Sequence, residues 1–249
     1  MRDPRYLALV GAAISLLTPA NAVAQAALDV PVRGQARVAA PDPARPCNLW
    51  RTAEEIARFV GVRVGFENTP DCAPGGHERR AYGPAIDLRG MTPRAVFDQI
   101  VQARPEFAWR PIDNVIVLRP KAAWHDPANV LHRPVARFTV AKLHPHLVLH
   151  EVLLAAQPSL FIAHEHAQLS ALGRRIDDPA ATGLIDVPIS VRFTGGTLLQ
   201  ALNAVAKPFG GNWDLSYWGR PHVELFTPDF DEGSTGITMA AATAPPGRR

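Results

Sequence analysis

Two stretches of this 249-residue chain carry the same order of chemical features, and this internal repeat constrains the fold more than any other property of the sequence. The first, residues 85–120, reads AIDLRGMTPRAVFDQIVQARPEFAWRPIDNVIVLRP. The second, residues 189–228, reads ISVRFTGGTLLQALNAVAKPFGGNWDLSYWGRPHVELFTP. An offset of 104 or 105 positions aligns residues of the same type: Gly90 with Gly195, Thr92 with Thr197, and Trp109 with Trp213.

Each stretch predicts a strand, a helix and a hairpin. In the first, Ile86 and Leu88 alternate with charged residues, as in a strand with one buried face. Thr92 followed by Pro93 indicates a helix start, because the threonine oxygen accepts from an otherwise unpaired backbone N–H and proline has no N–H to lose there. Apolar residues then recur at helical spacing until Pro105, and FAWRP and VIVLRP flank turn residues. The second stretch repeats this order.

A segment that predicts a helix and then a strand precedes each stretch. The first segment is residues 52–67, where Thr52 and Glu55 have the spacing of a capping box, and the second is residues 150–165. The predicted fold class is therefore α+β, with two tandem small units. Each unit is helix–strand and then strand–helix–strand–strand, with a short mixed or antiparallel sheet packed against helices.

The N-terminal residues predict a secretory signal peptide that is removed. Two arginines precede an apolar, uncharged run, and small residues at alternate positions follow it. The run is shorter than the roughly 20 residues that span a bilayer, so no membrane anchor is expected after cleavage. The predicted divisions are the signal peptide (1–26), a first module (27–120), a linker or extended strand (121–140), a second module (141–230) and a disordered tail (231–249).

With export predicted, the repeated pattern resembles the short N-terminal domain of secretins and TonB-dependent receptors, here in two copies. The residues that carry the resemblance are Leu88, Gly90, Thr92, Val96, Phe97, Trp109 and VIVL at 115–118, and in the second copy Phe193, Gly195, Thr197, Ala201, Leu202, Trp213 and VELF at 223–226. Nothing downstream resembles a secretin or receptor barrel. The resemblance implies a periplasmic or secreted protein.

The two cysteines predict one disulfide in an oxidising compartment. Cys47 and Cys72 are the only cysteines of the chain, and an even count in an exported protein is most simply one bridge. Two free or metal-bound thiols are the alternative. The spacing of Cys47 and Cys72 excludes a catalytic CxxC pair.

The charge pattern argues against nucleic-acid binding. The formal net charge is +3, and the 26 basic residues, 3 of them lysine, are interleaved with 23 acidic ones. A phosphate-binding surface needs basic residues gathered in one stripe.

Histidines give the clearest candidate for a metal site. If Pro145 starts a helix, His146 and His150 lie four apart on one face, a spacing that places two imidazoles on one zinc ion. His164 and His166 lie on one side of a predicted strand and could add ligands. Solvated or capping histidines are the alternative, and no HExxH motif is present.

No other pattern predicts catalysis, and no cofactor is expected. The sequence lacks GxSxG, and TGG at 194–196 has no following lysine, so it is not a phosphate-binding loop. Tyr217 and Trp218 are adjacent in a strand, so one of the two rings faces outward and is a candidate partner contact. Trp109 and Trp213 are expected in the core.

These observations favour a non-catalytic exported binding or adaptor protein that acts through protein–protein contacts in an envelope secretion, transport or signalling assembly. A short sheet has edge strands, and an edge strand offers unpaired backbone groups to an envelope protein partner. The alternatives are a periplasmic metal-binding protein or metal-dependent hydrolase that uses the histidines, and a cell-wall glycan-binding module.

Overall fold

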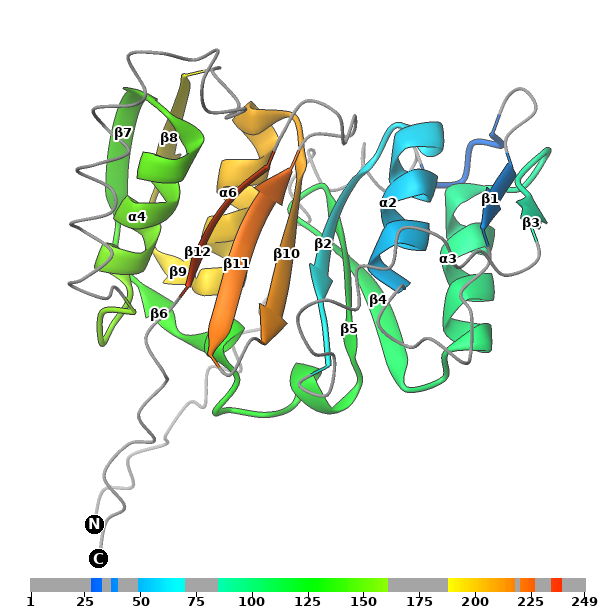
Figure 1. The fold of residues 1–249 in the computed structure, drawn as a ribbon, viewed down its shortest axis with the longest axis horizontal. Coiled ribbons are helices and arrows are strands. Elements are labelled where there is room, and N and C mark those ends of the chain that lie inside the picture. Colours follow the sequence, from blue (N-terminus) through cyan, green and yellow to red (C-terminus); the bar gives the residue numbers. More distant parts are fainter. Residues whose placement is uncertain are drawn as a thin grey trace, which may run out of the picture.

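A mixed β-sheet forms the centre of the computed structural model, which describes residues 28–32, 37–39, 49–69, 85–160, 188–217, 220–226 and 234–238. The strand order is β11-β10-β2-β5-β4, and β12 extends the sheet beside β11 (Figure 1). The strands are β2 (Arg63–Glu67), β4 (Phe107–Ile112), β5 (Val115–Pro120), β10 (Asn212–Tyr217), β11 (Pro221–Phe226) and β12 (Ser234–Thr238). Helices pack against this sheet, so the predicted α+β class is confirmed.

Two hairpins far apart in the sequence meet in this sheet through β2. The β4–β5 and β10–β11 pairs are antiparallel, whereas β2 runs parallel to β5 on one side and to β10 on the other. The Asn212 Oδ1 atom accepts a hydrogen bond of 2.7 Å from the backbone N–H of Val64 at this junction. The sequence predicts both hairpins, but their junction joins segments almost 150 residues apart and has no local sequence pattern.

Three two-stranded pairs lie outside the main sheet in the described part of the chain. They are β1 (Arg37–Ala39) with β3 (Ala85–Asp87), β6 (Pro134–Val135) with β9 (Gly196–Thr197), and β7 (Phe138–Leu143) with β8 (Ile189–Phe193). All three pairs are antiparallel. The β1–β3 and β7–β8 pairs therefore give the same kind of ladder ahead of the two helix–hairpin stretches.

Four α-helices are present in the described ranges, and two of them begin where the sequence predicts. The helices are α2 (Leu49–Val60), α3 (Pro93–Ala103), α4 (Pro145–Ala155) and α6 (Leu198–Phe209), and short 3-10 turns η2 (Ala122–Trp124) and η3 (Val130–His132) join β5 to β6. Thr92 caps α3 by accepting from the backbone N–H of Ala95, and Thr197 caps α6 in a reciprocal box with Gln200. Gly90 and Gly195 precede these caps with φ of 72° and 104°, a conformation that favours glycine.

Strand β5 separates two hydrophobic cores, because successive side chains point to opposite faces of the sheet. Val115 and Val117 belong to a core with α4 and α6, whereas Ile116 and Leu118 belong to a core with α2 and α3. In Figure 1 these two helix pairs lie at opposite ends of the molecule, with the sheet between them. One sheet therefore contributes side chains to the cores of both halves of the chain.

The two aligned tryptophans make the same contact in different surroundings. The Trp109 Nε1–H donates to Asp98 of α3 at 2.8 Å, and the Trp213 Nε1–H donates to Asn203 of α6 at 2.8 Å. Trp213 is fully buried and lies directly over Gly65, where a Cβ would collide with the indole ring, whereas Trp109 is half-buried. The stronger burial of Trp213 follows from the junction with β2.

Three local predictions can be compared with the structure. Thr52 lies inside α2, which begins at Leu49, so Thr52 is not the residue that caps the start of this helix. The range 121–140, for which a linker or an extended strand is predicted, contains the turns η2 and η3, the strand β6 and the start of β7, and its Leu131 is fully buried in the core with α4 and α6. Part of the range 231–249 is the strand β12, because the edge of β11 offers backbone groups that pair with it.

None of the described helices combines the length and the apolar character that a membrane crossing requires.

Candidate functional site

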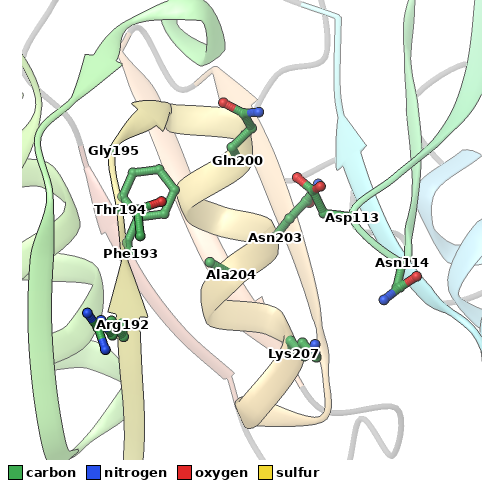
Figure 2. A pocket seen from close by; sticks show the side chains of 10 residues that line it. All are labelled: Asp113, Asn114, Arg192, Phe193, Thr194, Gly195, Gln200, Asn203, Ala204 and Lys207. Carbon is green, nitrogen blue, oxygen red and sulfur yellow. The ribbon is translucent and has the colours of Figure 1, made fainter. Parts of the chain in front are cut away.

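An open groove of about 430 Å³ lies where the two halves of the chain meet, and Figure 2 shows the side chains that line it. These come from three segments that are distant in the sequence. They are Asp113, Asn114, Arg192, Phe193, Thr194, Gly195, Gln200, Asn203, Ala204 and Lys207. A volume of this size accommodates a small ligand or a few residues of a peptide.

The turn between β4 and β5 forms one side of the groove. Asp113 and Asn114 have φ of 51° and 66°, the left-handed conformation that a two-residue hairpin turn requires and that Asp and Asn tolerate. The Asn203 side chain of α6 donates to the carbonyl of Ile112 at 3.1 Å and holds this turn beside the helix. The Asn114 Oδ1 atom is buried and accepts no hydrogen bond within the described residues.

The outer face of α6 forms the floor of the groove. Gln200, Ala204 and Lys207 recur at helical spacing on this face, and the apolar stripe of the helix faces the core. The side chain of Gln200 is held by the capping box, where its Oε1 atom accepts from the backbone N–H of Thr197 at 3.0 Å. Since Ala204 is small, the middle of the floor is open.

Strand β8 forms the other side. Its side chains at Ile189, Val191 and Phe193 are buried, so Arg192 and the following Thr194 point outward, as alternation along a strand requires. Among the described residues, β8 pairs with β7 alone, which leaves its second edge without a neighbouring strand. This edge borders the groove beside α6 (Figure 2).

The charge of the groove is predominantly positive. Arg192 and Lys207 are exposed, and neither side chain forms a hydrogen bond or an ion pair with another described residue. Asp113 is the single acidic group among the described residues that line the groove. The two cations are therefore available to a ligand that brings negative charge.

The edge of the main sheet at β4 is a poorer docking site. Within the described part of the chain, β4 is the last strand of the sheet beyond β5. It carries Pro111, which has no N–H to donate, and Arg110, whose guanidinium lies over the Trp124 ring at 4.5 Å. Proline and charge on an edge strand are common devices against strand pairing.

A buried polar cluster connects the two halves next to the sheet. Glu67 of β2 and Arg119 of β5 form an ion pair with 2.5 Å between Oε2 and Nε, and their side chains are 1% and 0% exposed. Asn129 donates to Glu67 and accepts from Arg119. The Tyr217 hydroxyl donates to Glu67 Oε1 at 2.7 Å. Burial, with a contribution from the nearby Glu67 carboxylate, raises the pKa of Tyr217.

The sequence singles out Tyr217 as a candidate partner contact. In the structure its hydroxyl donates a hydrogen bond to Glu67 within the same chain. Its ring packs against the core with α4 and α6. Trp218 lies outside the described residues. Of the repeat positions, the two glycines lie at turns and the two threonines cap helices. Trp213 lies in one core and Trp109 packs against the other.

A second buried carboxyl lies on β10. Asp214 is opposite Glu224 in the β10–β11 ladder, and its Oδ1 atom has no hydrogen-bond partner within the described residues. Burial, with the neighbouring Glu224 charge, raises the pKa of Asp214 well above its usual range. No repeat position or motif marks this residue in the sequence.

Two of the four predicted metal-binding histidines, His146 and His150, lie in the described part of the chain. His146 and His150 lie on α4, which begins at Pro145, and no group of three or more His, Cys, Asp or Glu side chains among the described residues has the arrangement of a metal site. Burial, with neighbouring His144, His150 and His222, lowers the pKa of His146 to about 4. His164 and His166 lie outside the described residues, as do Cys47 and Cys72.

Sequence reasoning does not identify Arg192 and Lys207 as site residues. Each is one basic residue among many, and they come together with the Asp113–Asn114 turn only in the fold. The alternation of β8 and the period of α6 do predict that both side chains point outward. What is missing is the information that these two outward faces border one groove.

Comparison of the chain with protein-family models, with curated proteins and with solved structures found no match.

Proposed function

We propose that this chain is an exported, non-catalytic binding protein that acts as an adaptor in an envelope secretion, transport or signalling assembly. In this proposal the chain consists of two tandem α+β units, each an antiparallel pair, two helices and a hairpin. The sequence resemblance to the short N-terminal domains of secretins and TonB-dependent receptors supports it. So do the matched threonine caps at α3 and α6 and the matched indole contacts at Asp98 and Asn203.

The observation that carries the proposal is the groove beside the free edge of β8. It combines an unpaired strand edge, an open helix face and two unpartnered cations within the described residues. Strand edges and adjoining grooves are a general mode by which domains bind other chains. The groove carries polar side chains that are suited to recognition. Among its described lining residues, Asp113 alone carries a carboxylate.

The proposal is tested by photocrosslinking from the floor of the groove in intact cells. A photoreactive residue at Ala204 is expected to capture one envelope protein at near-equal abundance with this chain. The matched control is the same residue at Ala103, an exposed position near the end of α3. Capture that is equal from both positions, or absent from Ala204 in several growth states, would contradict the proposed function.

A further inference from the structure

The β7–β8 pair covers the helices of its half incompletely. The buried side chains of β8 contact the core with α4 and α6, yet the outer face of α6 at Gln200, Ala204 and Lys207 lies beyond the β8 edge. Adjacent strands in a sheet lie about 4.8 Å apart, and a helix with its side chains is about 10 Å wide. One more strand beside β8 would therefore lie over the uncovered face of α6.

The shape of the groove fits an extended segment. One edge of β8 has no neighbouring strand among the described residues, so its backbone groups on that side can pair with an incoming chain. Alternate side chains of an added strand would point down onto the α6 floor, where Ala204 leaves room for them.

The charge of the groove selects an acidic segment. Arg192 points outward from β8, next to where a side chain of an added strand would pair across the ladder. Lys207 rises from the floor. Neither cation has a partner among the described residues, so a carboxylate would gain their attraction without breaking an existing ion pair.

We infer that the groove binds an extended, acidic segment of a partner protein, which adds as a third strand to β8 and places carboxylates against Arg192 and Lys207. This inference rests on the proposed function and specifies its partner: a strand-forming segment rich in Asp or Glu. The backbone of the partner segment pairs with the edge of β8, and Arg192 and Lys207 favour a segment of negative charge.

The first test measures binding of labelled ten-residue peptides by fluorescence anisotropy. A Glu–Val peptide built from the repeat Glu-Glu-Val presents carboxylates on both faces of a strand and is expected to bind the full chain, and the matching peptide with Lys in place of Glu is not. The double variant R192E/K207E should weaken binding of the Glu–Val peptide at least tenfold. The matched control R89E/K121E makes the same change in net charge at two exposed positions outside the groove and should leave binding within twofold.

The second test examines strand pairing with N-methylated versions of the Glu–Val peptide. Methyl groups on alternate amides block one edge of a strand and leave the other edge intact. One of the two methylation registers should abolish binding and the other should preserve it. Equal binding of both registers would overturn strand addition, since backbone pairing would then play no part.

Other outcomes overturn the inference without touching the proposed function. If R192E/K207E binds the Glu–Val peptide as tightly as R89E/K121E, or if no peptide binds at 1 mM, the acidic-strand inference is wrong. Crosslinking from Ala204 that persists in R192E/K207E cells would then leave the adaptor function standing with a different kind of partner. Binding of vesicles that contain anionic lipid, lost in R192E/K207E and unaccompanied by peptide binding, would point to a membrane surface.

Discussion

Replacing Arg119 by methionine is expected to destabilise the fold by about 3–5 kcal/mol, because it leaves the Glu67 carboxylate buried without its counter-charge. The arginine is fully buried, bonds Glu67, and donates to the carbonyl of Ala123 at 3.0 Å and to Asn129 at 2.9 Å. Its guanidinium also lies 4.8 Å from the ring centroid of Trp124. The variant keeps much of the side-chain volume, so the loss of free energy reports mainly on charge and hydrogen bonding.

The assay is reversible urea and thermal unfolding followed by circular dichroism. For a chain of this size, 1 kcal/mol corresponds to about 2–4 °C in the melting temperature, so Arg119→Met should melt about 6–20 °C below the wild type. The double variant E67Q/R119M should recover much of this loss, because no charge is then left buried and unpaired. The control Arg89→Met removes an ion pair whose arginine side chain is 57% exposed, and it should cost at most about 1 kcal/mol.

Two results would refute this reasoning. If the free energy of unfolding of Arg119→Met lies within 1 kcal/mol of the wild-type value, the buried Glu67 carboxylate does not depend on Arg119 as its counter-charge. If the loss of free energy of unfolding in E67Q/R119M equals the sum of the losses in Glu67→Gln and Arg119→Met, then Glu67 and Arg119 do not interact.

Three further predictions concern the same fold. Gly65→Ala is expected to destabilise by about 1–3 kcal/mol, because its Cβ would collide with the Trp213 ring; a urea midpoint equal to that of the wild type would contradict the close approach. Because the pKa of Asp214 is raised in the folded chain, this carboxyl loses its proton at a lower pH in the unfolded chain than in the folded chain. The contribution of Asp214 to the free energy of unfolding therefore falls as the pH rises above about 4. Asp214→Asn should remove that loss in urea titrations from pH 4 to 8, and an unchanged slope would count against it. The lowered pKa of His146, about 4, means that the unfolded chain takes up a proton first as the pH falls below about 6.5, so stability falls toward pH 4. His146→Gln should flatten this acid-side decline, and a variant with the wild-type pH profile would show that His146 is not its source.

The parts of the fold that the sequence predicts are those set by neighbours along the chain. Thr92 and Thr197 cap their helices because a hydroxyl and a backbone N–H three residues on are enough to define a helix start. The turn at Asp113 and Asn114 follows from residue types that tolerate positive φ. Local chemistry therefore predicts these caps and this turn, and with them the strand–helix–hairpin order of the two stretches.

The assembly of these elements could not be predicted, because it depends on contacts between distant segments. The parallel pairing of β2 with both hairpins joins residues near 65 to residues near 116 and near 214. Glu67 looks like an ordinary strand-end carboxylate until the fold brings Arg119 and Tyr217 to it. The groove has the same origin, since its three lining segments have no sequence signal in common.

Amide hydrogen exchange at the two edge strands tests the central claim most directly, which is that the free edge of β8 receives the partner. The measurement compares the full chain alone with the chain saturated by the Glu–Val peptide or by the protein captured from Ala204. The account predicts slower exchange at residues 189–193 of β8 and unchanged exchange at residues 107–112 of β4. Protection that appears at β4 instead, or at neither edge while the ligand is bound, would contradict it.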